Sequence, residues 1–589
     1  MVLHHIVNTD HVRLRLSTCC TQLIEVSIVV STLMCLAYMI APFVSWTMAF
    51  PISTIVTIAA SIGLVVIALD LAVNKAQVLR GRHSWLLFLM LGLSIFASIR
   101  MSAYGAQKNI STIAATCAMC TLFYSYARRV ELARAQKMMK ILFYLAAGLW
   151  LAACIVSILT YLYNVGYLEQ TSLDPTRNWT PQGFTDHRVF GVFMALNLAT
   201  NVSAILLIGS IYLLIYERSG SDSRSNSYRT SRGNSRLCTA AKKIFLLISA
   251  IVFFSLIILS GTRSALVALI SAAAASGAYW GYWQISKATN KNRTTPVEHH
   301  LPSQHGPITS QHRHIAGSSR RLICATLGAF LCVAVTCTGM WATREILSRV
   351  PELPIFTHSQ ASFREFLETS APKLGISITI NEPTADTDAN AQREHLNTEE
   401  QVEADHIDAH TREEKDKERT NILERPDVTS EDISNNRFAI WKDYLGLWRE
   451  IGLIGLSPGN YRAYISDHHP DLYIAEHIRA EYSATRNANA VYHPHNIFLF
   501  TWVSSGLIGA AALIIFLLWC FADCIRYAHR HGKYNPLFGV LFSIVLACVV
   551  FAMFEVGLVY KNNGVTAIFW LLAGVLMEIS TGDVRKIQR

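Results

Sequence analysis

The stretch Tyr492-His493-Pro494-His495-Asn496 is followed without a break by the apolar run Ile497–Leu518, and together they decide how this chain is organised. A helix needs about 17–25 apolar residues to cross a membrane, and residues 497–518 contain no charged side chain. The stretch therefore predicts a membrane helix that begins after Asn496 and carries His495 at its mouth, facing water. Small residues at Gly506 and Gly509 line one early face of this helix.

The residues at the helix mouth suit proton transfer. An imidazole titrates near neutral pH and is the commonest general base in enzymes, so His495 can act between a lipid-borne substrate and a water-borne one. A lone histidine at a helix start can equally be a simple cap or interface residue. We interpret Asn496 as the N-cap of the helix, with substrate contact as its second role, and His493 as a supporting residue.

The composition of the whole chain indicates a polytopic membrane protein. Of its 589 residues, 52% are hydrophobic and only 16% are charged, and the mean hydropathy is +0.31. These values exclude an ordinary soluble globular protein. We predict an all-α fold of about twelve transmembrane helices, with eleven as the alternative count. The expected spans are 24–44, 49–69, 85–99, 110–126, 141–163, 189–216, 244–260, 264–283, 322–341, 497–518, 537–554 and 564–579.

The distribution of basic residues predicts the orientation, because positively charged short loops stay in the cytoplasm. If the N-terminus is inside, the basic clusters at 75–82, 128–140, 218–243, 287–321, 526–533 and 585–589 are all cytoplasmic. The short loops on the other side contain few Lys and Arg residues. We therefore predict cytoplasmic N- and C-termini. We attribute the net charge of +10 to topology and to contact with anionic membrane lipid, and not to nucleic-acid binding.

This topology divides the chain into three regions. Residues 1–341 form a membrane region of about nine spans, with basic cytoplasmic loops at 217–243 and 284–321, and residues 497–589 form a second membrane region of about three spans. Residues 342–496 between them form one large, mostly helical loop on the outer side. Its stretch 381–433 is rich in Asp, Glu and Thr, and we interpret it as an acidic, flexible insert.

Three polar segments fall at the outer membrane boundary, although the predicted topology does not depend on them. They are Arg188 before a span that contains Asn197, the turn Ser260-Gly261-Thr262-Arg263 between two spans, and His495. Both arginines are expected at or near a helix N-terminus, where free amides, the helix dipole and a guanidinium fork bind phosphate oxygens. An arginine at a helix end is often only an anchor at the membrane interface. Arg263 occupies so short a turn, however, that its charge needs a partner.

At these positions the chain resembles the O-antigen ligase family. This family lies within a wider group of membrane glycosyltransferases that also contains O-antigen polymerases and protein O-oligosaccharyltransferases. The resemblance covers most of residues 185–520 by order and spacing. It departs from the family pattern at Leu196, where relatives often have proline, and in the acidic insert. The matching pieces are Arg188/Gly191/Phe193/Asn197, Ser260-Gly261-Thr262-Arg263, Arg437…Trp441…Gly455…Gly459-Asn460-Tyr461, and His495-Asn496 followed by Gly506 and Gly509.

The resemblance implies transfer of a glycan from an undecaprenyl-diphosphate carrier to lipid A-core oligosaccharide, at the periplasmic face of a bacterial inner membrane. No pair of carboxylates suggests a double displacement, and no Asp-x-Asp motif suggests a metal site. We therefore expect inverting transfer without a metal or cofactor. The implied roles are His495 as the catalytic base, Arg188 and Arg263 as diphosphate ligands, and Asn496, His493, Ser260 and Asn197 as supporting residues.

Other functions stay open. An O-antigen polymerase or a protein O-oligosaccharyltransferase would use the same donor, and residue types alone do not separate them from a ligase. The single long loop directly before the histidine motif favours the ligase. A lipid-linked glycan transporter is the alternative from another class. Few ionisable residues lie centrally in the spans, and the large loop divides the spans nine to three instead of into matched halves, which argues against an ion-coupled carrier.

Overall fold

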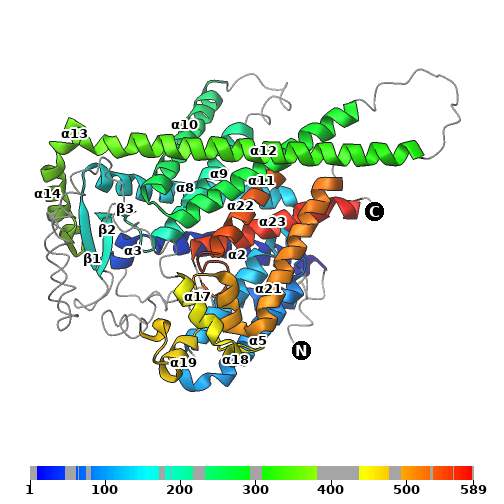
Figure 1. The fold of residues 1–589 in the computed structure, drawn as a ribbon, viewed down its shortest axis with the longest axis horizontal. Coiled ribbons are helices and arrows are strands. Elements are labelled where there is room, and N and C mark those ends of the chain that lie inside the picture. The colour runs from blue at the N-terminus through cyan, green and yellow to red at the C-terminus, as the bar shows by residue number, and fades with distance from the viewer. Residues whose placement is uncertain are drawn as a thin grey trace, which may run out of the picture.

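The chain is a predominantly helical protein with one small β-sheet at one side, as Figure 1 shows for the computed structural model. The structure describes residues 10–46, 62–63, 65–73, 81–105, 107–170, 179–185, 188–216, 232–291, 308–380, 437–476, 493–530, 535–561 and 563–586.

In the described part of the chain, nine helices are long and apolar enough to cross a membrane, and two shorter apolar helices, α5 (Ser84–Arg100) and α22 (Pro536–Ala552), accompany them. These helices overlap eleven of the predicted spans, and the predicted span 49–69 lies mostly outside the described residues. The predicted span 24–44 is too long at its end, because α2 stops at Ala37. The all-α polytopic fold class is confirmed. The long helical segments are α2 (Asp10–Ala37), α6 (Gln107–Ala118) continued by η3 (Met119–Phe123) and α7 (Tyr126–Arg129), α8 (Leu132–Leu162), α9 (Leu196–Tyr216), α10 (Arg232–Leu259), α11 (Arg263–Lys291), α12 (Ile308–Arg349), α21 (Ile497–Arg530) and α23 (Gly564–Lys586).

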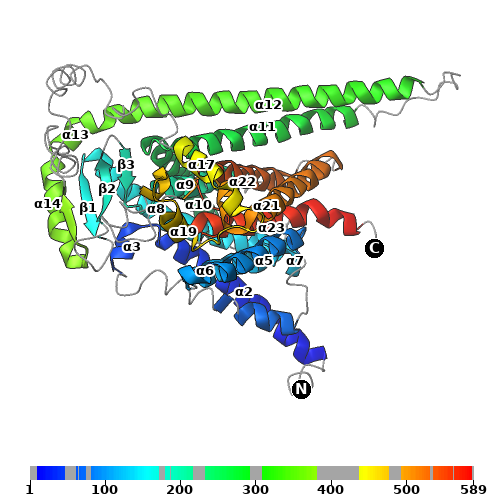
Figure 2. The ribbon, with the colours of Figure 1, turned by 60° about the horizontal axis from the view of Figure 1, so that its bottom comes forward.

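Helices α11 and α12 lie side by side along one edge of the bundle and extend beyond it at one end (Figures 1 and 2). Two glycines permit this contact. A Cβ on Gly277 would lie 2.2 Å from the carbonyl oxygen of Gly328, and a Cβ on Gly328 would lie 2.3 Å from that of Gly277. Small residues of this kind allow membrane helices to approach backbone to backbone.

A four-stranded antiparallel sheet lies after α8 and is absent from the predicted fold. Its strands β1 (Gly166–Gln170), β2 (Trp179–Thr185), β3 (Arg188–Gly191) and β4 (Ile378–Ile380) follow the order β3-β2-β1-β4. Tyr167 pairs with Ile380. The sheet therefore joins the segment before α9 to the first part of the large loop. The short helix α3 (Ala41–Trp46) contacts β1.

The sheet corrects the predicted span 189–216. Residues 188–191 form β3, and helix α9 begins only at Leu196. Arg188 pairs with Thr185 of β2 and therefore lies in a strand, not at the helix N-terminus where we expected it. The prediction was wrong because an apolar run such as Val189-Phe190 does not by itself distinguish a short buried strand from the start of a helix.

The described parts of the large loop are residues 342–380, 437–476 and 493–496, and the acidic insert 381–433 lies outside them. The first part contains the end of α12 and the second packs against α21, and both are mostly helical (Figure 1). Their remaining elements are η5 (Val350–Glu352), α13 (Pro354–Thr357), α14 (Gln360–Ser370), η6 (Pro372–Leu374), α17 (Arg437–Gly446), α18 (Trp448–Ile451) and α19 (Tyr461–His468), and η2 (Ser102–Tyr104) follows α5.

Helix α21 is broken at Gly506, where φ is 72° and ψ is −178°. The loop 452–456 fills the break and supplies hydrogen-bond partners that the helix no longer provides, as a membrane interior requires. A Cβ on Gly506 would lie 2.1 Å from the carbonyl group of Leu453, so only glycine fits. The bonds join Leu507 N to the Gly452 carbonyl (3.1 Å), Ile508 N to the Leu453 carbonyl (3.3 Å) and Leu456 N to the Val503 carbonyl (2.7 Å).

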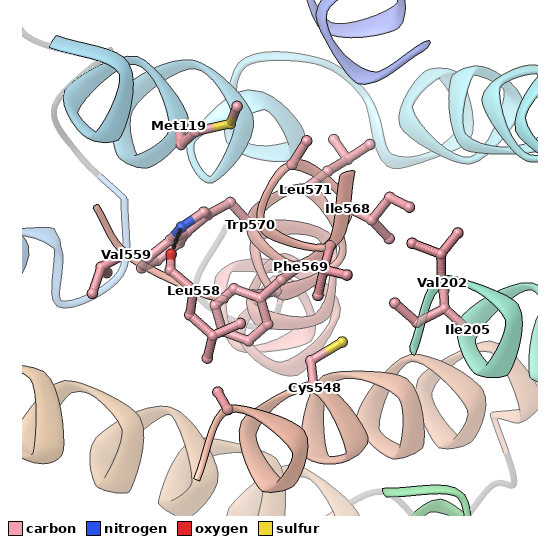
Figure 3. Packing of buried hydrophobic residues seen from close by; sticks show 14 of the residues in the cluster. Met119, Val202, Ile205, Cys548, Leu558, Val559, Ile568, Phe569, Trp570 and Leu571 are labelled. Carbon is pink, nitrogen blue, oxygen red and sulfur yellow. Dashed lines mark hydrogen bonds between the residues drawn. The ribbon is translucent and has the colours of Figure 1, made fainter. Parts of the chain in front are cut away.

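The apolar core around α23 fixes residues 553–561, which follow α22. Trp570 is completely buried, and its indole N–H donates to the carbonyl oxygen of Leu558 at 2.8 Å. Figure 3 shows this bond, with Phe569 lying between Leu558 and Cys548. A buried indole needs such a partner, and the bond anchors the connecting loop to the core.

Candidate active site

His495 is positioned by its neighbour at the first turn of α21. The Asn496 side-chain oxygen accepts the backbone N–H groups of Phe498 at 2.9 Å and Leu499 at 3.1 Å. Asn496 therefore caps α21, as predicted. Its amide also donates to the carbonyl oxygen of Met553 at 3.1 Å, which joins the start of α21 to the end of α22. His495 itself has a φ of 45°, so the chain turns sharply just before the helix.

The carboxylate of Glu555 orients the imidazole of His495. His495 Nδ1 lies 3.0 Å from Glu555 Oε1. The other carboxylate oxygen, Oε2, accepts the Asn197 amide at 3.0 Å and lies 3.9 Å from an Arg437 guanidinium nitrogen. Groups from α9, α17 and the start of α21 thus converge on one carboxylate, in the loop that Trp570 anchors.

The charge of Glu555 determines which nitrogen of His495 can accept a proton. Burial raises the pKa of Glu555, but the opposing effects of His495, Lys561 and Asn197 outweigh it and hold the pKa at about 2. An ionised carboxylate only accepts hydrogen bonds, so Nδ1 of His495 carries the proton. In the neutral imidazole, Nε2 is then the nitrogen that can accept a proton. The His495 side chain is 18% exposed and that of Glu555 only 9%.

Lys561 adds a positive charge to the same region. Burial lowers its pKa to about 8, the Glu555 carboxylate opposes this effect, and Arg462 reinforces it. The Glu555 carboxylate is therefore surrounded by more than one positively charged side chain. This charge balance suits an anionic substrate.

His493 faces a different set of partners from those of His495. Its Nε2 lies 2.6 Å from an Arg462 guanidinium nitrogen, which can only donate, so Nε2 accepts. Its Nδ1 lies 2.8 Å from the hydroxyl oxygen of Tyr461. Burial, and then the charges of Lys561 and Arg462, lower the pKa of His493 well below its ordinary value. His493 is thus a buried, neutral residue that connects α19 to the start of α21.

The segment before α21 is also attached to α17. The Trp441 indole N–H donates to the carbonyl oxygen of Pro494 at 2.6 Å, between the two histidines. Arg437 lies one helical turn earlier on α17, beside Glu555. Helix α17 therefore contacts Glu555 and the residue that directly precedes His495.

Arg188 and the turn before α11 form a second group. Helix α10 ends at Leu259 and α11 begins at Arg263, so the predicted short turn is confirmed. Arg188 Nε donates to the carbonyl oxygen of Ser260 at 3.2 Å. The Ser260 hydroxyl accepts the backbone N–H of Thr262 at 3.2 Å, which closes the turn, and the exposed Arg263 opens α11.

The segment 188–197 connects the two groups. Arg188 at its start contacts the Ser260 turn, and Asn197 at its end contacts Glu555. The structure thus brings Arg188 to Ser260, and His495 to the carboxylate that Asn197 holds. His493 belongs to the separate arrangement with Tyr461 and Arg462.

The sequence did not identify Glu555 as a partner of His495. The available signal was that Glu555 is the single carboxylate between residues 537 and 563, at the edge of an apolar run, where a charge needs a partner. Arg437 and Trp441 appeared only as parts of a spacing pattern. Their contacts with Glu555 and with Pro494 depend on the packing of α17.

Comparison with known families identifies the central part of the chain. Residues 248–514 match a family model described as O-antigen ligase. The matched segment contains the Ser260–Arg263 turn, the large loop and His495, whereas Arg188, Asn197 and Glu555 lie outside it. A search of curated proteins found no match to the chain.

Proposed function

Residues 248–514 belong to the O-antigen ligase family, whose members are glycosyltransferase-like enzymes of the ligase or polymerase type, and on this premise we propose that the protein is a ligase. Its donor would be a glycan on undecaprenyl diphosphate, and its acceptor a sugar hydroxyl of lipid A-core oligosaccharide at the periplasmic face of the inner membrane. The observation that supports the proposal most directly is the hydrogen bond between His495 Nδ1 and the buried Glu555 carboxylate.

His495 would act as the general base toward the acceptor. A sugar hydroxyl is a weak nucleophile and gains reactivity when a base removes its proton during attack. With Nδ1 bonded to Glu555, Nε2 of His495 takes this proton, and the ionised carboxylate stabilises the resulting imidazolium. Glu555 is then a positioning residue that acts through His495.

Arg188 and Arg263 would bind the diphosphate of the donor. Arg263 is exposed at the first residue of α11, where the helix dipole and the free amides add to its positive charge. The hydrogen bond from Arg188 to Ser260 places a second guanidinium beside the same turn. Together they neutralise charge that develops on the leaving oxygen, which is where electrostatic catalysis is most effective.

The transfer is a single displacement. The acceptor oxygen forms a bond to the anomeric carbon, and the bond from that carbon to the diphosphate oxygen breaks. The proton passes to His495 Nε2, and the electron pair leaves with undecaprenyl diphosphate. This step inverts the anomeric centre and needs no metal ion. Transfer that disappears with EDTA and returns with magnesium would contradict the metal-independent mechanism.

The test is transfer in vitro by purified protein given a labelled undecaprenyl-diphosphate glycan and rough lipopolysaccharide. Parallel reactions contain the donor alone or a pilin-like protein as the acceptor. His495→Ala is compared with His468→Ala, which changes an exposed histidine on α19 of the same loop. We expect label on lipopolysaccharide, a loss of about 10²–10⁴-fold in His495→Ala, and full activity in His468→Ala.

The other outcomes each point to a different function. Lengthening of the carrier-linked glycan without acceptor would make the protein a polymerase, and label on the pilin-like protein would make it a protein oligosaccharyltransferase. Flux of carrier-linked glycan across vesicles, without transfer and unaffected by His495→Ala, would support the transporter.

A further inference from the structure

A cavity of 240 Å³ lies among four membrane helices, and no residue of the candidate active site lines it. Its walls come from α8, α9, α22 and α23, and the lining side chains are nearly all aliphatic or aromatic. Figure 3 shows one part of this region, where Ile568 of α23 lies toward α9, which carries Val202 and Ile205. The polar groups of the lining are the side chains of Lys140, Gln136 and Tyr212.

The polar side chains that line the cavity lie at the end of the helix bundle opposite His495. Asn197 lies in the first turn of α9 and contacts Glu555, and Tyr212 is fifteen residues later. At a rise of about 1.5 Å per residue, Tyr212 lies roughly 22 Å along the helix from Asn197. Helix α22 ends near Glu555 and α8 ends before the sheet, and the cavity contacts the first part of both. Under the predicted topology this is the cytoplasmic leaflet.

The cavity is too large and too apolar to be explained by water. A space of about 10–15 Å³ already holds one water molecule, but a water needs polar partners to remain bound. This cavity is many times larger and offers such partners only near Lys140. In a bilayer, the hydrocarbon that can fill it is a lipid chain.

We propose that this cavity binds an acyl chain of an anionic phospholipid, whose phosphate contacts Lys140. The ammonium group is exposed at the first turns of α8, where it meets the head groups of the surrounding leaflet. A basic residue beside an apolar cavity between helices is the arrangement that recognises an anionic lipid. Gln136, one turn before Lys140 on α8, adds a hydrogen-bond donor at the same mouth.

The carrier lipid of the donor fits this site less well. Its diphosphate would be bound beside Arg188 and Arg263, which lie at the other end of α9 and α10. The head group at Lys140 must therefore come from the opposite leaflet. The lipid site does not depend on the proposed transfer reaction, because its occupancy is measured without donor or acceptor.

Photocrosslinking of the full-length protein in detergent micelles tests the proposal. The probe is a phosphatidylglycerol with a diazirine in one acyl chain, and crosslinked peptides are mapped by mass spectrometry. We expect crosslinks in the cavity-lining parts of α8, α9, α22 and α23. Lys140→Ala should lower capture about fivefold, which corresponds to the loss of one lysine near a lipid phosphate. The matched control Lys137→Ala changes an exposed lysine of the same helix that does not line the cavity.

A second pair of variants tests the cavity itself. Val540→Phe should fill part of the cavity and lower capture, whereas Val335→Phe places the same change on the exposed face of α12. Size-exclusion profiles and thermal unfolding confirm that each variant is folded. Equal capture by Lys140→Ala and Lys137→Ala, equal capture of a phosphatidylcholine probe, or preferential capture of a polyprenyl-phosphate probe would overturn the proposal.

Discussion

His495 and Glu555 are 60 residues apart in the sequence, yet Nδ1 of the imidazole lies 3.0 Å from Oε1 of the carboxylate. One side chain precedes α21 and the other follows α22, so the contact depends on how these two helices pack. Asn496 reinforces the arrangement through its bond to the Met553 carbonyl. The chemistry assigned to His495 therefore depends on the position of a residue outside the matched family segment.

Glu555→Gln should lower kcat for transfer by about 10–100-fold and leave the donor KM nearly unchanged. Glutamine keeps the shape of the side chain and one acceptor oxygen for His495, but replaces the other oxygen by an NH2 donor and removes the negative charge that stabilises the imidazolium. Initial rates at several donor concentrations separate the two constants. Because the pKa of Glu555 is about 2, titration of Glu555 should not contribute to the pH–rate profile above about pH 4.

Glu169→Gln is the matched control for this variant. Glu169 is another buried carboxylate, but it lies in β1 and accepts a hydrogen bond from Ser45 at 2.7 Å. The Glu169→Gln variant should transfer glycan at the wild-type rate. Equal losses in the two variants would mean that Glu555 has only a structural role, and a raised donor KM in Glu555→Gln would assign it to donor binding.

Arg263→Ala should raise the donor KM and lower kcat, with a combined loss of about 10²–10³-fold in kcat/KM. The guanidinium is expected to contact the diphosphate in the ground state and to stabilise the charge that grows on the leaving oxygen. Arg263→Lys should recover only part of the activity, because an ammonium group does not form the two-pronged contact. The control is Arg349→Ala, an exposed arginine that pairs with Glu345 on α12. Unchanged kinetics in Arg263→Ala would place the diphosphate elsewhere.

Features that depend on local sequence were predicted well. Membrane helices are encoded by long apolar runs, so the helices α8 and α21 fall where those runs are. The cap at Asn496 and the turn at Ser260 also follow from a few adjacent residues. The position of His495 at the mouth of α21 also follows from the adjacent sequence.

Features that depend on pairing between distant segments were not predicted. Strand β4 begins at Ile378 and pairs with β1, more than 200 residues earlier, and the two strands have no local signal that links them. The short β3 is continuous with an apolar run, so Arg188 was assigned to a helix N-terminus. Gly506 was noted as a small residue, but its contact with Leu453 shows that it breaks the helix to admit a loop.

The stability of the protein should fall as the pH rises through the range in which Glu169 titrates. Burial raises the pKa of Glu169 to about 7 in the folded protein, although the Ser45 hydrogen bond opposes this effect, whereas its ordinary value is 4.5. The folded state therefore binds the proton more tightly than the unfolded state. The stabilisation is complete below about pH 4.5 and is lost as the pH rises through about 7. The difference between these two pKa values corresponds to at most about 3 kcal/mol in the free energy of unfolding.

Thermal unfolding at pH 5 and pH 8 tests whether stability falls as the pH rises. The drop in Tm between the two values should be smaller by a few degrees in Glu169→Gln, because the amide mimics the protonated acid at both pH values. Other groups titrate in the same range, so the comparison is between variant and wild type. A Tm difference that is identical in the two proteins would refute the assignment to Glu169.

Gly506→Ala should destabilise the protein by at least about 2 kcal/mol and lower the yield of folded protein. The positive φ of 72° is strained for any residue with a Cβ, and that Cβ would also collide with the Leu453 backbone. Because the obstacle is backbone, it cannot move aside as a side chain can. The displaced loop would carry Gly455 away from Arg100, whose guanidinium donates to its carbonyl at 2.6 Å.

The matched control is Gly148→Ala in α8, where an added Cβ meets no atom within 4 Å. That change should stabilise the helix slightly, because alanine has the higher helix propensity. Thermal unfolding in detergent, with size-exclusion chromatography to quantify monodisperse protein, compares the two. If Gly506→Ala unfolds at the wild-type temperature, the loop 452–456 does not hold the break in α21, and the packing of that loop would not be what positions the start of α21 and His495.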